Sequence, residues 1–259
     1  MKKPIVIKIG GSTLGQHDTT LEDLITLQKR GDNVVVVHGG GKIITEWLSK
    51  QGAVTKFVQG ERVTDKISLE VVTAVLCGLV NKQIVADLNI LGGKAVGISG
   101  VDGFLLECKI GNPAQGFVGQ IIRVNTNLIK IIIEAGYIPV VSSISLYSIE
   151  KIADSPSLLN VNADTAAGEI AAALGAEKLI FLTDIAGVYD KSGKVISRID
   201  SKEVEEHITS GVASGGMIPK IRAGVKALGS VKETRIIDGR RSHALLHEFE
   251  FQQGGTTIF

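Results

Sequence analysis

The stretch PIVIKIGGS, residues 4–12, is a short run of β-branched residues that ends in two glycines. Its isoleucines and valine are typical of a strand covered on both faces. Lys8 interrupts the run, and an ammonium in an apolar strand is costly unless an anion meets it. Gly10 and Gly11 let the backbone approach a ligand closely, with N–H groups that suit phosphate oxygens. The stretch predicts either an anion-binding lysine beside a glycine turn or a lysine that snorkels from the strand end.

The same order of strand, glycines and helix recurs at residues 34–52. Four valines lead into HGGGK, residues 38–42, and an apolar helical pattern follows as far as Gly52. Two such units predict a parallel sheet with anion-binding loops at the carboxyl ends of the strands. The three glycines bring several N–H donors to a helix N-terminus, where a carboxylate or phosphate would bind. A tight turn that needs small residues only for packing would look the same.

A third glycine turn, residues 214–217, leads into a helix that carries Lys220 in its first turns. A lysine is unfavourable near the positive end of a helix unless a polyanion offsets it. Lys8 and Lys220 together resemble the clamp that phosphoryl transfer requires, in which the protein positions and neutralises charge. Neither GxxxxGK[ST] nor GxGxxG after a strand is present, which disfavours a P-loop or a Rossmann dinucleotide site.

The composition of the 259-residue chain excludes several classes of function. Charged residues make up 21% and the net charge is +1, so a general nucleic-acid or membrane-surface binder is not indicated. Cys77 and Cys108 lack the spacing of a zinc site or a disulfide framework, and the pair His243 and His247 alone does not indicate a metal site. No run reaches the roughly 18 apolar residues of a membrane span. We therefore expect a soluble cytoplasmic protein without a metal site, a nucleic-acid partner or a membrane partner.

The rest of the chain is expected to continue this alternation of helices and strands. Residues 53–65 look like a loop, and the helix that follows, to about residue 92, has an apolar stripe wide enough for the core and a second subunit. Glycines at turn-like spacing predict β-hairpins over residues 103–124. Residues 143–158 look like a polar connector between two lobes. We expect one domain, residues 1–259, with an N-terminal lobe of about residues 1–155 and a C-terminal lobe of about residues 156–259.

Five motifs carry a resemblance to a known family. In chain order they are VIKIGGS at 6–12, VHGGGK at 37–42, GERVTD at 60–65, NVNAD at 160–164 and GGMIPK at 215–220. The chain resembles the amino acid kinase family over nearly its whole length. The combination of HGGGK and RVTD makes it most similar to the members that phosphorylate N-acetyl-L-glutamate.

The resemblance implies an α/β fold, a three-layer αβα sandwich with a mainly parallel central sheet. It implies that the amino-acid substrate binds the N-terminal lobe and that ATP binds the C-terminal lobe. The residues matched to functional positions fall into three groups. They are catalytic Lys8, Lys220 and Asp164; substrate-binding Gly40, Gly41, Arg62 and Asn160; and nucleotide-binding Gly10, Gly11, Thr183, Asp184 and Met217.

The implied reaction is the ATP-dependent phosphorylation of the γ-carboxylate of N-acetyl-L-glutamate, in arginine biosynthesis. That carboxylate is ionised at pH 7, with a pKa near ~4.3, so it needs no general base. Mg²⁺ would be held mainly by ATP phosphates and water. One alternative substrate is aminoadipate or glutamate held on a carrier protein. Another alternative is a non-catalytic amino-acid sensor of the same fold.

The resemblance also bears on assembly. Arginine-inhibited members of the family look like hexamers built by an added N-terminal helix, and the three residues before Pro4 are too few for one. The segment His243 to Gly255 resembles the arginine-site region of those members, which argues instead for inhibition by arginine. We expect a homodimer, paired through the apolar stripe of residues 69–88, that arginine does not inhibit.

Overall fold

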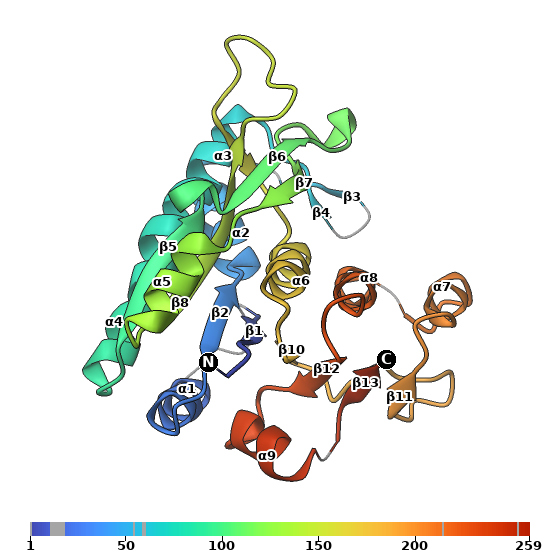
Figure 1. The fold of residues 1–259 in the computed structure, drawn as a ribbon. Helices are drawn as coiled ribbons and strands as arrows, with labels where there is room; N and C mark the ends of the chain where they lie inside the picture. Colours follow the sequence, from blue (N-terminus) through green and yellow to red (C-terminus); the bar gives the residue numbers. More distant parts are fainter. Residues whose placement is uncertain (1, 11–18, 54, 59–60, 214, 253) are drawn as a thin grey trace.

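The computed structural model describes residues 2–10, 19–53, 55–58, 61–213, 215–252 and 254–259. In these residues an 11-stranded sheet forms the centre of the protein (Figure 1). Nine of its strands follow one path, β11-β13-β12-β10-β1-β2-β8-β6-β7, and β5 and β9 also pair with β8. The strands are β1 Ile5–Ile9, β2 Val34–His38, β5 Ala95–Gly100, β6 Leu106–Ile110, β7 Gly119–Val124, β8 Ile138–Tyr147, β9 Leu158–Asn160, β10 Lys178–Thr183, β11 Arg198–Ile199, β12 Glu233–Asp238 and β13 Thr256–Ile258.

Most neighbouring strands run parallel. Within the 11-stranded sheet, the exceptions among the described residues are the antiparallel pairs β12–β13, β6–β7 and β8–β9. β1 lies in the middle, parallel to β2 on one side and to β10 on the other. Ile9, at the end of β1, is in register with both His38 and Leu182. The carboxyl ends of β1, β2 and β10 therefore share one edge of the sheet, which is where ligands bind in open parallel sheets.

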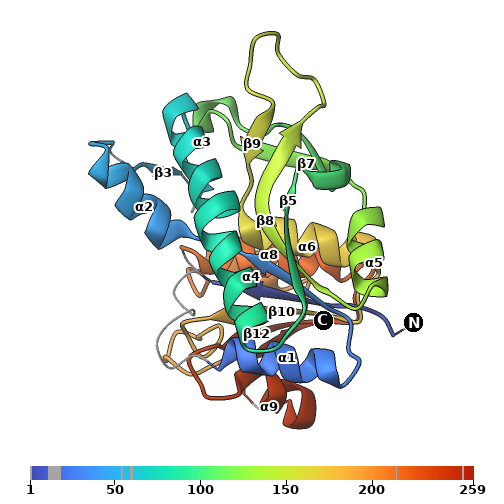
Figure 2. The ribbon, with the colours of Figure 1, turned by 90° about the vertical axis from the view of Figure 1, so that its left-hand side faces the viewer.

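Helices cover both faces of the sheet, which confirms the predicted three-layer fold. One apolar core joins a face of the sheet to α5, α6 and α8, and a second joins the other face to α1, α2, α9 and the long helix before β5 (Figures 1 and 2). The helices are α1 Thr20–Lys29, α2 Gly41–Lys50, α3 Lys66–Thr73, α4 Asn81–Ile90, α5 Asn127–Glu134, α6 Ala163–Leu174, α7 Val204–Thr209, α8 Met217–Ala227 and α9 Ala244–Phe251, with short 3₁₀ turns at Asp102–Phe104 and Pro113–Gln115.

The alternation along β1 decides where Lys8 points. Ile5, Ile7 and Ile9 belong to the core that includes α1 and α9, whereas Val6 belongs to the core that includes α6. Side chains two residues apart share a face of a strand, so Lys8 lies on the same face as Val6. The lysine of β1 is thereby directed toward α6.

The structure corrects three expectations about local structure. Residues 53–65 contain a small hairpin of β3 (Phe57–Val58) and β4 (Glu61–Arg62), rather than only a loop. The first part of the expected connector, residues 143–147, continues β8, and only residues 148–157 form a projecting loop before β9 (Figures 1 and 2). The long helix contains a π-helical segment, Ala74–Val80, between α3 and α4.

The continuous helix from Lys66 to Ile90 is the one described segment whose length and composition would let it cross a membrane, with a mean hydropathy of 1.5 in its most apolar window. Within that window, 44% of the residues are buried inside the protein. Figure 2 shows this helix lying along one face of the sheet. Core helices of soluble proteins meet the same criterion, so the helix is weak evidence for a membrane span.

Candidate active site

Three charged residues from distant parts of the chain meet near the carboxyl end of β1. The ammonium of Lys8 lies 2.8 Å from Oδ1 of Asp164, and the ammonium of Lys220 donates to Oδ2 of the same carboxylate at 3.1 Å. Lys220 also donates to the backbone oxygen of Gly216 at 3.1 Å. The side chains of Lys8 and Asp164 are only 8% and 7% exposed. The structure thus brings together the three residues predicted to be catalytic.

Asp164 is held in the first turn of α6 by the residue before the helix. The side-chain oxygen of Asn162, the N-cap residue, accepts hydrogen bonds from the backbone N–H groups of Asp164 and Thr165 at 2.8 and 3.3 Å. An asparagine in this position satisfies N–H groups that the helix leaves unpaired. The cap fixes the first turn of α6 and therefore the height of the carboxylate above β1.

The two lysines determine the charge state of Asp164. Burial acts to raise the pKa of this carboxyl, but the charges of Lys8 and Lys220 outweigh burial and hold the pKa below its usual value. Asp164 is thus a carboxylate at neutral pH, and its single negative charge faces two positive charges. The cluster keeps an excess positive charge, which suits an anionic ligand.

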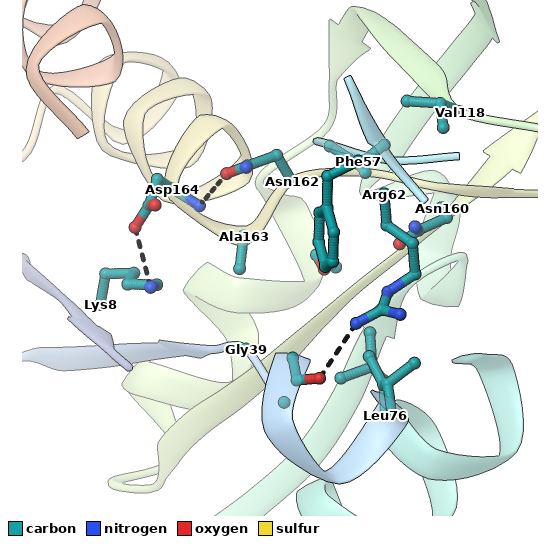
Figure 3. A pocket seen from close by; sticks show the side chains of 15 residues that line it. Lys8, Gly39, Phe57, Arg62, Leu76, Val118, Asn160, Asn162, Ala163 and Asp164 are labelled. Carbon is teal, nitrogen blue, oxygen red and sulfur yellow. Dashed lines mark hydrogen bonds and ion pairs between the residues drawn. The ribbon is translucent and has the colours of Figure 1, made fainter. Parts of the chain in front are cut away.

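A cavity of about 170 Å³ extends from this cluster toward the N-terminal end of α2. Lys8 and Asp164 lie at one end of it, and Arg62 and Asn160 at the other (Figure 3). Gly40 and Gly41 also line the cavity. The structure therefore gathers all four residues predicted to bind substrate around one space that also reaches Lys8.

The glycine loop presents unpaired donors to this cavity. Gly40 is the N-cap of α2, and a Cβ on it would lie 2.8 Å from a methyl carbon of Leu76, so a larger residue there would have to displace that side chain. Among the described residues, none accepts a hydrogen bond from the N–H of Gly40 or Gly41. The start of α2 therefore offers free N–H groups and the positive end of the helix dipole to an anion.

Arg62 is fixed beside this helix start. Its guanidinium donates to the backbone oxygen of Gly41 at 3.0 Å and to the hydroxyls of Thr45 and Thr55 at 2.8 and 3.0 Å. Its guanidinium carbon lies 4.8 Å from the centre of the Phe57 ring. Burial lowers the pKa of Arg62 below its usual value, yet an arginine remains charged in proteins. The side chain contributes a fixed positive charge at the end of the cavity away from Lys8.

The residues predicted to bind nucleotide lie outside this cavity. Gly10 follows β1, Thr183 ends β10, and Asp184 comes next, so these three lie at the same sheet edge. Met217 is the first residue of α8, three residues before Lys220. The predicted position Gly11 lies outside the described residues. Thr183 and Asp184 thus lie on the side of β1 opposite to β2, because β10 and β2 flank β1.

Several residues of the site escaped prediction from the sequence. Phe57 and Leu76 line the cavity, and neither stands in a recognisable motif. The capping role of Asn162 has a signal, because an asparagine just before an apolar helix pattern is a common N-cap. Ser143 lines the cavity from β8 in a stretch that the sequence presented as a connector.

Comparison with known proteins identifies the family. The sequence model of the amino acid kinase family matches residues 3–238. The chain belongs to the amino acid kinase family. Its relatives in the family include an acetylglutamate kinase of Dehalococcoides mccartyi (strain CBDB1), 45% identical over 254 residues that cover 98% of this chain and 93% of the relative. An acetylglutamate kinase of Cereibacter sphaeroides (strain ATCC 17029) is also 45% identical, over 98% of this chain and 86% of the relative.

Solved structures show the same fold. The crystal structure of smu.665 from Streptococcus mutans UA159 aligns with a TM-score of 0.86 and 32% identity, covering 100% of this chain and 99% of that chain. This amino acid kinase thus shares both its fold and its length with a solved protein, in agreement with the fold class expected from its motifs.

Proposed function

We propose that this protein is an ATP-dependent kinase that phosphorylates the γ-carboxylate of N-acetyl-L-glutamate and forms N-acetyl-γ-glutamyl phosphate, a step of arginine biosynthesis. The observation that carries the proposal is the cavity that joins the free N–H groups at the start of α2 to the Lys8–Asp164–Lys220 cluster. Relatives named acetylglutamate kinase, 45% identical over nearly the whole chain, support this choice of substrate.

In the proposed reaction an oxygen of the γ-carboxylate attacks the γ-phosphorus of ATP. A carboxylate O–P bond forms, the bond from the γ-phosphorus to the bridging oxygen breaks, and ADP leaves with that electron pair. The excess positive charge of Lys8 and Lys220 stabilises the transferring phosphoryl group, and Asp164 positions both ammonium groups. The nucleophile is already ionised, so no base is needed.

The two ends of the dicarboxylate substrate are assigned to the two ends of the cavity. The N–H groups of Gly40 and Gly41 hold the reacting carboxylate, where the helix dipole also favours it. Arg62 holds the other carboxylate through its planar guanidinium, which is suited to paired hydrogen bonds. The amide of Asn160 donates to Thr64 at 3.0 Å, so it is fixed at the cavity wall as a substrate contact.

ATP is proposed to lie over the C-terminal lobe, residues 156–259, with the amino-acid substrate on the N-terminal lobe, residues 1–155. Gly10 and Gly11 would bind its phosphates, and Thr183, Asp184 and Met217 would surround the nucleotide. Asp164 is the one carboxylate among the described cavity residues, and both of its oxygens contact lysines. Mg²⁺ would therefore be held by the ATP phosphates and water, and it would neutralise phosphate charge there.

We also propose that the protein acts in the cytoplasm as a homodimer. The expectation that the stripe of residues 69–88 is left for a second subunit is corrected, because most of its apolar side chains are buried in the protein's own core and Leu79 is 46% exposed. Ile67 and Ile90, on the same helix just outside the stripe, are 64% and 82% exposed. A two-fold pairing would cover these side chains with a single self-complementary surface.

The proposed activity is tested by an ADP-release assay with purified protein and one acceptor at a time. N-acetyl-L-glutamate is expected to give the highest kcat/KM among N-acetyl-L-glutamate, L-glutamate, L-aspartate, carbamate and UMP. Activity only on glutamate or aminoadipate attached to a carrier protein would reverse the assignment of substrate. No ADP release with any acceptor would indicate a sensor rather than an enzyme.

A further inference from the structure

His38 is a buried histidine that directly precedes the glycine loop of the site. It is the last residue of β2 and is 0% exposed. Its Nε2 lies 3.1 Å from the side-chain nitrogen of Asn81, and its Nδ1 lies 3.1 Å from the backbone oxygen of Gly39. The ring does not line the cavity, so any effect on the reaction must pass through the loop.

The orientation of the Asn81 amide determines which ring nitrogen carries the hydrogen. The side-chain nitrogen of Asn81 lies 2.9 Å from the oxygen of Val140 and 3.3 Å from that of Ile98. The side-chain oxygen of Asn81 accepts from the ammonium of Lys82 at 3.1 Å. All three contacts would be lost if the amide were turned over, because its oxygen would then face the oxygens of Val140 and Ile98 and its nitrogen would face the ammonium of Lys82. The amide nitrogen is therefore the donor toward Nε2 of His38.

A histidine that accepts at Nε2 carries its hydrogen on Nδ1. Nδ1–H of His38 then donates to the carbonyl of Gly39. A second proton, on Nε2, would point at the N–H groups of Asn81. Burial, together with the charges of Lys8 and Lys82, opposes that proton and lowers the pKa of His38 to about 4, although the hydrogen bond to Gly39 acts in the other direction. The imidazole is thus neutral, with one tautomer.

This hydrogen bond turns the peptide between Gly39 and Gly40. The described chain has no cis peptide bond, so the C=O of Gly39 and the N–H of Gly40 point in opposite directions. With the carbonyl facing the buried ring, the N–H of Gly40 faces the opposite side, where Gly40 lines the cavity. A Cβ on Gly40 would lie 2.8 Å from a methyl carbon of Leu76, so a side chain there would have to displace Leu76. Two glycines in sequence would otherwise leave the peptide free to rotate.

We propose that His38, oriented by Asn81, is a positioning residue that aims the N–H of Gly40 at the reacting carboxylate of the substrate. The inference rests on the proposed function for the identity of that carboxylate. It concerns binding of the amino-acid substrate and not of ATP.

Two amide substitutions separate the two contacts of the ring. The side-chain nitrogen of asparagine can occupy the place of Nδ1, so His38→Asn keeps the donor to Gly39 and loses the contact with Asn81. The side chain of glutamine reaches the place of Nε2, so His38→Gln keeps Asn81 and loses Gly39. The KM for N-acetyl-L-glutamate should rise about tenfold in His38→Gln, as for one lost hydrogen bond to a charged group, and stay within about threefold in His38→Asn. The KM for ATP should change in neither.

The proposal would be overturned if the KM for N-acetyl-L-glutamate were lower in His38→Gln than in His38→Asn, or equal in both variants. A ring with only a structural role would depend on its contact with Asn81 at least as much as on its contact with Gly39. A second measurement is made on the wild type without substrate, and a folded His38 variant serves only to assign the signal. Long-range ¹H–¹⁵N spectra of the histidine-labelled wild type should show one imidazole, absent from the His38 variants, as the Nδ1–H tautomer that does not titrate between pH 5.5 and 8. An Nε2–H tautomer or a charged ring would overturn the proposal. A wild type inactive toward N-acetyl-L-glutamate would contradict the proposed function. The positioning role of His38 toward the loop would then be accepted or rejected on the observed tautomer of its ring.

Discussion

Lys8 of β1 and Lys220 of α8 approach the two different oxygens of one buried carboxylate, at 2.8 and 3.1 Å. Because we propose that their charges stabilise a phosphoryl group in transit, Lys8→Ala or Lys220→Ala should lower kcat far more than it raises either KM. Loss of one preorganised donor costs about 2.7–4 kcal/mol, or ~100–1000-fold in kcat. Steady-state kinetics with both substrates varied will measure the change.

Lys226→Ala provides the matched control for that experiment. Lys226 lies on α8 like Lys220, but its side chain is 64% exposed and pairs with Glu169. This variant should retain the kcat of the wild type. A Lys8→Ala enzyme with kcat within threefold of the wild type would show that the lysine has no part in the chemical step.

Asp164→Asn should destabilise the fold in a pH-dependent way. The folded-state pKa of Asp164 is below its ordinary value, so its contribution to stability is present above the unfolded pKa of about 3.9 and is lost as pH falls through the folded pKa. At pH 7 the variant leaves the buried ammonium of Lys8 without its counter-charge and leaves Lys220 with the oxygen of Gly216, at a cost of about 3 kcal/mol. Urea unfolding between pH 3 and pH 7 should show that the difference from the wild type shrinks at acid pH. A difference that stays constant over this range would refute the assignment of the charge.

Arg62→Lys keeps a positive charge but removes the planar guanidinium that contacts Gly41, Thr45 and Thr55. The KM for N-acetyl-L-glutamate should rise at least tenfold, within the ~1.5–3 kcal/mol of a charged hydrogen bond, while the KM for ATP stays unchanged. Arg123→Lys is the control, because Arg123 is 67% exposed and pairs with Glu107 on the surface. An equal rise in both KM values would indicate a folding defect instead.

His243 should make stability fall at mildly alkaline pH. Its Nδ1 lies 2.7 Å from Oδ1 of Asp23, and that hydrogen bond raises the pKa of the histidine above 6.5. A group with a raised folded-state pKa stabilises fully below its unfolded pKa and loses that effect as pH rises through the folded value. Thermal unfolding from pH 5.5 to 9 should show this slope in the wild type and in His207→Gln, and a flatter profile in His243→Gln. Identical profiles for all three proteins would exclude the effect.

The proposed dimer predicts which apolar side chain matters for assembly. Ile90→Glu, at a residue 82% exposed on α4, should convert the protein from dimer to monomer in sedimentation velocity. Ile131→Glu, on α5, introduces the same charge at a residue 61% exposed and should leave the dimer intact. A wild-type protein that sediments as a monomer, or a dimer unaffected by Ile90→Glu, would contradict the proposed surface.

The sequence predicted the architecture well, because its strands and helices are locally consistent. The valines of β2 and the isoleucines of β1 predict buried parallel strands, and the glycines after these two strands indicate where each strand ends. The fold class and the clustering of Lys8, Asp164 and Lys220 followed from these features and from the family motifs. The helix that holds Asp164 begins where the asparagine of the NVNAD motif caps it.

The parts that were wrong or missed depend on tertiary packing. The expected polar connector of residues 143–158 included Ser143 and Ser145, yet both are buried within β8, where the hydroxyl of Ser145 donates to the oxygen of Ser143. Burial between neighbouring strands outweighed their weak preference for strands. The π-helical segment at residues 74–80 was not predicted from the sequence, and Leu76 within it lies beside Gly40.

The central place of β1 has a consequence for how the chain folds. β1 is made before the other strands that the structure describes, and its partner on one side, β10, begins at Lys178. During synthesis one edge of β1 therefore lacks its partner, and Lys8 lacks its counter-charge until Asp164 has been made. Such distant pairing slows folding and exposes a strand edge to aggregation. The cluster of Lys8, Asp164 and Lys220 therefore assembles only after the segment with Lys220 has been made.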